Sequence, residues 1–130
     1  MSRIVRTAAA TALALSGLWL GTAPAGAASL PSCTRAVADM GVFVPGTSSG
    51  SVDCVLGVGN QGEAVDVLQS AMHYCYGEDV AADGVFGPAT KAALRRVQSR
   101  AGVYPDGVYG PQTRNAMLFL GHSGGGCQQY

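Results

Sequence analysis

The sequence predicts an all-α fold: a compact three-helix bundle with a tandem turn-helix repeat, preceded by a disulfide-stapled loop or short hairpin arm. An eight-residue phrase occurs twice, as DGVFGPAT at residues 83–90 and as DGVYGPQT at residues 106–113. Each copy precedes apolar residues at helical spacing, and a similar apolar stripe runs through residues 63–75. Four cysteines are distributed around these segments.

Residues 1–27 have the pattern of a secretory signal peptide. Arg3 and Arg6 precede an uncharged, Ala/Leu-rich run, and the small residues at 25–27 suit a signal peptidase. We expect cleavage before Ala28. The remaining chain has six basic and eight acidic residues, a net charge of −2, which argues against nucleic-acid binding. It has no second apolar run of membrane length, so we expect no membrane span after signal removal.

The four cysteines predict two disulfide bonds, because the chain is small and the expected compartment is oxidising. Four cysteines allow three pairings, and the sequence alone does not choose among them. Our preferred pairing is Cys33 with Cys54, which closes a local loop, and Cys75 with Cys127, which ties the tail to the body. Each bond would stabilise the fold by about 2–4 kcal/mol.

Residues 28–58 are expected to form the stapled arm. Residues 42–45 and 55–56 have the composition of two short strands, and the turn-forming stretch GTSSGS lies between them. We expect these two segments to pair as a hairpin, which would be marginal without further packing.

Three helices are expected to form the bundle, over residues 63–75, 88–100 and 112–120. A glycine that can stop a helix follows each of them (Gly77, Gly102 and Gly121). Residues 122–130 are expected to form a flexible tail that only Cys127 tethers.

Each part of the repeated phrase has a structural role. Asp-Gly favours a tight turn, in which the Asp carboxylate can accept downstream N–H groups. Gly-Pro suits the start of a helix, and the following Thr can hydrogen-bond near that start. We expect the Val and the aromatic residue after it to enter the core beside the turn. The phrase therefore predicts architecture rather than a duplicated active loop.

Three spaced motifs carry a family resemblance: G-x-A-V-x-x-L-Q at 62–69, D-G-V-F-G-P-A-T-x-x-A-L-x-x-x-Q at 83–98 and D-G-V-Y-G-P-x-T at 106–113. In this order they resemble the bacterial peptidoglycan-binding domain of the three-helix type, over residues 59–121. The resemblance implies a small three-helix bundle. It also implies a secreted, cell-wall-associated, non-catalytic module of the kind that holds cell-wall hydrolases, amidases and carboxypeptidases on their substrate.

The sequence offers no catalytic constellation. His73 and His122 form no HExxH or other paired-histidine motif, and no G-x-S-x-G elbow exposes a serine. We therefore expect no enzyme activity, no metal and no cofactor. Two alternatives stay open: a small cell-wall hydrolase or amidase, and a protein that binds a secreted wall enzyme as inhibitor or targeting partner.

A peptidoglycan binder needs aromatic platforms for sugar faces and donors for carboxylates or N-acetyl carbonyls. The candidate ligand-binding residues lie at the turns and on the neighbouring helices: Tyr104, Tyr109, Arg114, Asn115, Arg95 and Gln69. Some have structural alternatives. Tyr109 can plug its turn, Gln69 can bond the facing loop, and Arg95 can belong to a solvated basic helix face. We expect the protein to be a monomer.

Overall fold

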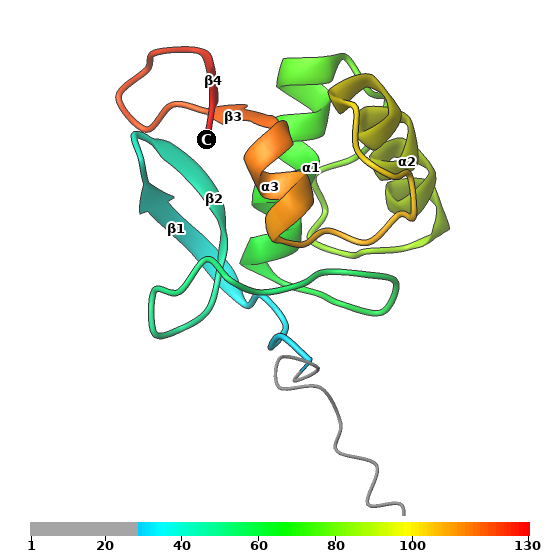
Figure 1. The fold of residues 1–130 in the computed structure, drawn as a ribbon, viewed down its shortest axis with the longest axis horizontal. Helices are drawn as coiled ribbons and strands as arrows, with labels where there is room; N and C mark the ends of the chain where they lie inside the picture. The colour runs from blue at the N-terminus through cyan, green and yellow to red at the C-terminus, as the bar shows by residue number, and fades with distance from the viewer. Residues whose placement is uncertain (1–28) are drawn as a thin grey trace, which may run out of the picture.

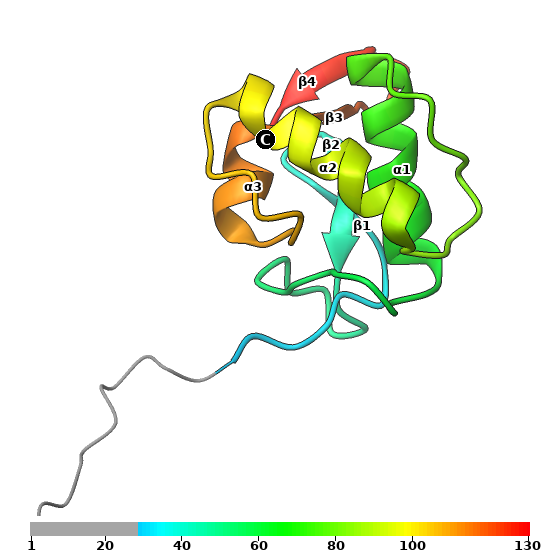
Figure 2. The same ribbon diagram turned by 90° about the vertical axis from the view of Figure 1, so that its right-hand side faces the viewer.

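The computed structural model describes residues 29–130, so the predicted signal peptide lies outside the described residues. Within them the chain forms three helices and two antiparallel two-stranded sheets (Figure 1 and Figure 2). The helices are α1 (Glu63–Tyr76), α2 (Pro88–Ala101) and α3 (Pro111–Ala116). The strands are β1 (Arg35–Asp39), β2 (Val42–Gly46), β3 (Leu118–Leu120) and β4 (Cys127–Gln129).

The prediction of an all-α three-helix bundle with a tandem turn-helix repeat is wrong. The third helix was expected over residues 112–120, but α3 has only six residues and the backbone is extended at Met117. Residues 118–120 then form β3, with Phe119 buried between two half-buried leucines. A three-residue apolar run fits a strand as well as a helix, and the neighbouring strand β4 decides between them here.

The C-terminal tail is part of this second sheet. β4 pairs antiparallel with β3, with Leu118 opposite Gln129 and Leu120 opposite Cys127. The Tyr130 hydroxyl also donates to the carboxylate of Asp39 at 2.8 Å. The prediction that Cys127 alone holds the tail is therefore wrong, because strand pairing and the terminal tyrosine hold it as well.

The N-terminal hairpin has a different partner from the one expected. β2 pairs with β1 rather than with residues 55–56, and Met40 and Gly41 connect the two strands. Both connecting residues have positive φ, 49° and 86°, as a two-residue hairpin turn requires. Residues 55 and 56 form only isolated bridges, to Ser32 and to Tyr109.

The first two helices follow the sequence prediction closely. α1 and α2 end at Gly77 and Gly102, whose left-handed φ of 70° and 78° is typical of a C-terminal stop. Pro88 occupies the start of α2, and Gly87 precedes it as N-cap.

One hydrophobic core joins the arm to the helices. α1 is the central element, with both hairpins on one side and α2 on the other (Figure 1). Val42, Val44 and Leu56 of the arm are fully buried together with Leu68 of α1 and Phe119 of β3. The stapled arm therefore completes the core and does not hang from it.

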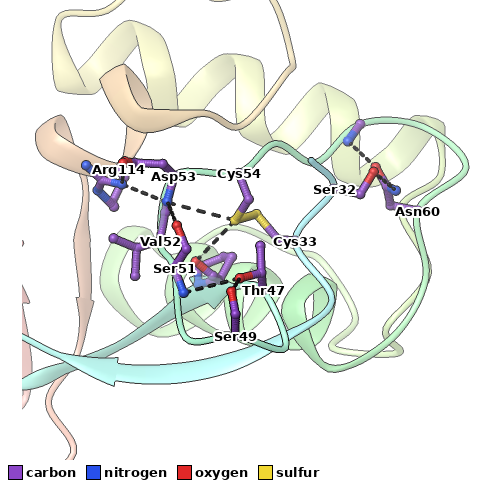
Figure 3. The surroundings of a disulfide bond; sticks show 12 residues. Ser32, Cys33, Thr47, Ser49, Ser51, Val52, Asp53, Cys54, Asn60 and Arg114 are labelled. Carbon is purple, nitrogen blue, oxygen red and sulfur yellow. Dashed lines mark hydrogen bonds and ion pairs between the residues drawn. A yellow bond between two sulfur atoms is a disulfide. The ribbon is translucent and has the colours of Figure 1, made fainter. Parts of the chain in front are cut away.

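The two disulfides are those of the preferred pairing. Cys33 bonds to Cys54, with 5.1 Å between their Cα atoms, and Cys75 bonds to Cys127, with 5.6 Å. Both cysteines of the first bond are buried, and Figure 3 shows the bond among residues of the loop 47–54. Through Cys54, the bond anchors the start of residues 56–62, which contact both copies of the repeated phrase.

Gln69 of α1 holds the first copy of the repeated phrase. Its side-chain oxygen accepts the N–H of Gly84 at 2.9 Å. Its nitrogen lies 3.0 Å from three acceptors: Asp83 Oδ1, Val85 O and Thr90 Oγ1. The Gln69 side chain is buried, so these contacts replace water for the whole amide.

Gln98 of α2 makes the same four contacts with the second copy. Its oxygen accepts the N–H of Gly107 at 2.9 Å. Its nitrogen lies within 3.0 Å of Asp106 Oδ1, Val108 O and Thr113 Oγ1. Each helix thus fixes the turn that follows it through one buried glutamine.

The turn chemistry that the phrase predicts is confirmed. The carboxylates of Asp83 and Asp106 accept the N–H two residues downstream, at 3.0 and 2.9 Å. Gly84 and Gly107 have positive φ of 72° and 74°.

We predict that Gln98→Ala lowers the free energy of unfolding by about 1–3 kcal/mol, because it leaves the buried Gly107 N–H and the Val108 carbonyl without partners. Urea unfolding followed by circular dichroism measures this loss. Ser99→Ala is the matched control, since Ser99 is the next residue of α2 and is exposed. Equal stability of the two variants would contradict the role of the amide.

Candidate functional site

One backbone segment lies between the two turns and pairs with both. The N–H of Leu56 donates to the carbonyl of Tyr109 at 3.0 Å, and the reverse bond is 2.9 Å. Four residues later, Asn60 accepts the N–H of Phe86 at 2.9 Å. Residues 56–62 therefore place the two copies of the phrase on one side of the molecule.

Three valines project from these paired segments into solvent. Val58, Val85 and Val108 are 59%, 47% and 44% exposed, and we call them the turn face. The prediction that the valine of each phrase enters the core is wrong, because neighbouring residues of an extended segment face opposite sides. Only the aromatic residues, Phe86 and Tyr109, point inward.

A shallow pocket of about 410 Å³ lies beside the first turn. Its walls are the beginning of α1 and the turn, and three of its side chains are carboxylates, those of Glu63, Asp66 and Asp83. The Val85 N–H and then the Gln69 amide hold the pKa of Asp83 below its usual value. In the described part of the chain none of these carboxylates forms an ion pair.

Two of the predicted ligand-binding residues are accessible near the second turn. Tyr104 is 81% exposed, more than any other large hydrophobic side chain of the described residues. Arg95 is exposed on α2, and its Nε donates to the carbonyl of Pro105 at 3.1 Å. The structure brings these two residues to the same loop.

Two further candidates are buried. Gln69 is 1% exposed, and its amide is committed to the first turn. Tyr109 is completely buried and packs edge-on against Phe119, with 6.4 Å between ring centroids. Burial raises the pKa of Tyr109 far above its usual value, and its hydroxyl has no partner among the described residues. Their role in ligand binding stays a prediction.

Arg114 and Asn115 form a separate group at the arm. Arg114 is buried, and its Nη1 donates to Val52 O at 2.7 Å and to Asp53 Oδ1 at 3.0 Å (Figure 3). Its guanidinium also lies 4.7 Å from the centre of the Tyr130 ring. Asn115 is exposed and accepts the Arg114 Nε–H at 3.2 Å. In this arrangement Arg114 joins α3, the arm and the C-terminus.

The acidic pocket was missed by sequence reasoning, which assigned Glu63 and Asp66 to a helix start and Asp83 to a turn. The spacing of Asp66 and Gln69 in the sequence could have indicated this pocket. Asp66 lies three residues before Gln69, so both occupy one side of α1. Because Gln69 reaches the turn that contains Asp83, Asp66 faces the same turn.

Comparison with known protein families identifies this region. Residues 61–117 match the family model described as "Putative peptidoglycan binding domain". The matched segment contains both turns and both glutamines that hold them. The chain belongs to this family. Its peptidoglycan-binding domain begins at the pocket and ends at the start of the C-terminal sheet.

A curated relative of the domain is the "Zinc D-Ala-D-Ala carboxypeptidase" of Streptomyces albus G. The two are 45% identical over 94 residues, which is 69% of this chain. The chain spans 35% of the length of that relative.

Three solved structures are also similar, each with a TM-score of 0.46 over 48% of this chain. The SleB N-terminal domain is 39% identical, with 85% of its length covered. A peptidoglycan-binding protein from Clostridioides difficile, solved with glutamine hydroxamate, is 33% identical, with 39% covered. A fused Zn-dependent amidase/peptidase/peptidoglycan-binding protein from Clostridium acetobutylicum ATCC 824 is 35% identical, with 28% covered.

Two further observations concern residues 29–130. None of their helices is both long and apolar enough to cross a membrane. Their His, Cys, Asp and Glu side chains do not gather in groups of three or more that are suited to a metal ion.

We predict that Tyr109→Phe keeps or raises the stability of the domain, by up to about 2 kcal/mol, because it removes a buried hydroxyl without a partner. The first copy already has Phe86 at this position. Thermal unfolding compares the variant with the wild type. As a reference, Tyr109→Ala should cost about 3–5 kcal/mol through the cavity that it leaves. A clear loss of stability in Tyr109→Phe would show that the hydroxyl has a partner.

Proposed function

We propose that this chain is a secreted, non-catalytic module that binds peptidoglycan of the bacterial cell wall. The observation that carries the proposal is the family match over residues 61–117, since it includes both turns and most of the first-turn pocket. The ligand would lie against the turns, where the chain has its shallow pocket and its exposed valines.

The chemistry of this surface suits a glycan with short peptides. Sugar rings have apolar C–H faces, which the exposed valines of the turn face and the ring of Tyr104 can contact. Arg95 contacts Pro105, the residue after Tyr104, and can donate to a carboxylate or an N-acetyl carbonyl. The buried glutamines hold both turns in place before the ligand arrives, which reduces the entropy lost on binding.

Binding without hydrolysis fits the environment of the two histidines. His73 lies at the end of α1, with Nδ1 2.9 Å from the carbonyl of Glu78. His122 is exposed and contacts Ser123. Neither histidine lines the first-turn pocket. The carboxypeptidase activity named for the Streptomyces relative is a property of that protein, of which this chain spans about a third.

Secretion is supported by the signal pattern of residues 1–27 and by the two disulfides. Disulfide bonds persist in oxidising compartments outside the cytosol. A secreted module of this kind would meet its ligand directly in the cell wall.

We predict that the protein, after removal of residues 1–27, co-sediments with purified cell-wall sacculi. Tyr104→Ala should weaken this binding by about 1 kcal/mol or more, because it removes an exposed aromatic platform without disturbing the core. Tyr74→Ala is the matched control, since Tyr74 is also exposed but lies on the last turns of α1. The bound fraction at several protein concentrations gives the affinities.

Absence of wild-type protein from the sacculus pellet would contradict the proposed function. Equal losses in the two tyrosine variants would contradict the placement of Tyr104 in the site. The turbidity of the same sacculi provides the check on catalysis, because a hydrolase or amidase would lower it with time and a binding module would not.

A further inference from the structure

The N-terminal hairpin leaves one strand edge without a partner. β1 pairs with β2 and with no other strand of the described residues. β2 is the inner strand of the hairpin, because Val42 also bridges to Gly121, which follows β3 (Figure 1). The outer edge of β1 therefore carries backbone groups that no strand of this part of the chain uses.

The register of the hairpin determines which backbone groups these are. The connecting turn has two residues, so Asp39 and Val42 on either side of it exchange both backbone hydrogen bonds. Bonded and non-bonded pairs then alternate along the two strands, which places Ala36 and Ala38 in non-bonded pairs. Pro45 lies opposite Ala36 and has no N–H, in agreement with this pattern. The N–H and C=O groups of Ala36 and Ala38 therefore point away from β2, and no other segment of residues 29–130 bonds to them.

This edge is accessible to another backbone. Ala38 is exposed and Ala36 is half-buried. A hollow of about 320 Å³ lies along residues 35–38, with residues 48–50 as its other wall. Edge strands of monomeric proteins are commonly protected by lysine, proline or a bulge. The centre of this edge instead has the sequence Ala-Val-Ala, whose small side chains allow a second strand to approach.

The free backbone groups of the edge are complementary to those of a second copy. In an antiparallel pair of β1 strands centred on Val37, Ala36 of one copy lies opposite Ala38 of the other. Such a pair exchanges two N–H···O=C bonds, and the two-fold symmetry produces the pair twice. All outward groups of Ala36 and Ala38 are then bonded, and the two hairpins form one four-stranded sheet.

The charges at the two ends of β1 match the same register. Arg35 lies two residues before Val37 and Asp39 two residues after it, so each faces the opposite charge of the second copy. Arg35 is the only arginine of residues 29–130 whose side chain makes neither a hydrogen bond nor an ion pair. Asp39 accepts the N–H of Met40 at one oxygen and the hydroxyl of Tyr130 at the other. A carboxylate has about four acceptor positions, so it can accept a guanidinium as well.

We propose that two copies of this chain associate through the outer edges of their β1 strands, in the antiparallel register centred on Val37. The monomer expected from the sequence took no account of this edge, because residues 35–39 were not predicted as a strand. The contact is small, so association is weak and depends on protein concentration.

This association goes beyond the proposed function and does not depend on it. β1 contributes no residue to the first-turn pocket or to the turn face, so pairing through β1 is compatible with binding at the turns. A pair of copies then has two binding surfaces, which raises the apparent affinity for a polymer that both can reach.

The first test is sedimentation equilibrium of the chain without residues 1–27, from about 10 μM to about 1 mM protein. The weight-average mass should rise with concentration toward that of two chains. Ala38→Pro should weaken this association at least about tenfold, because proline removes an N–H that the single copy does not use. Ala38→Val is the matched control, since it keeps that N–H at the same position and should associate like the wild type.

The second test exchanges the charges at the two ends of β1. Arg35→Glu places carboxylates opposite each other in the pair, and Asp39→Arg places guanidinium groups opposite each other. Each variant alone should therefore stay monomeric. An equimolar mixture of the two should associate, because every charge then meets its opposite. A loss of folding cannot produce this rescue, and circular dichroism confirms that both variants are folded.

Three results would overturn the inference. The wild type could stay monomeric over the whole concentration range. Ala38→Pro could associate as strongly as Ala38→Val, which would place the contact elsewhere on the molecule. The mixture of Arg35→Glu and Asp39→Arg could stay monomeric while the wild type associates, which would exclude the register centred on Val37. None of these results bears on sacculus binding, so the proposed function is tested separately.

Discussion

The hydrogen bonds of two buried glutamines, Gln69 and Gln98, hold the two turns on which the proposed binding surface is built. Each turn needs a donor for its carbonyl and carboxylate oxygens and an acceptor for the N–H of its glycine. A glutamine side chain supplies both from one planar group. Glutamate would offer no donor at neutral pH, and a shorter side chain would not span from the helix to the turn. The exposed valines and the pocket depend on turns that are fixed in this way.

The arm and the C-terminal sheet complete the hydrophobic core that the helices form in part. A domain of this size buries a modest core, so each covering element contributes a large share of it. The Cys33–Cys54 bond anchors the segment that pairs with both turns, and the Cys75–Cys127 bond joins α1 to the second sheet. Arg114 connects the arm to α3 through Val52 and Asp53. The proposed binding surface is thus supported by covalent bonds and by the buried guanidinium of Arg114.

The sequence predicted features that depend on local rules. The limits of α1 and α2 follow from glycine stops and a proline start, and the turn chemistry follows from Asp-Gly. The prediction that the third helix extends to residue 120 was wrong because residues 118–120 are too few to show a helical or strand periodicity. Their strand partner lies beyond a glycine-rich loop. The predicted hairpin partner of β2 was wrong because strand pairing depends on register rather than on composition. The pocket could not be predicted as a cavity, since its walls come from residues 61–66 and 82–85, which are separated in the sequence.

We propose that the two turns held by glutamine present the peptidoglycan-binding surface. Titration of the isotope-labelled protein with soluble peptidoglycan fragments, followed by amide chemical shifts, tests it most directly. We expect the largest shifts at residues 58–66 and 82–85, with smaller ones at 104–108. Largest shifts on the hairpin of β1 and β2, or no shifts at a concentration at which sacculi are bound, would contradict it.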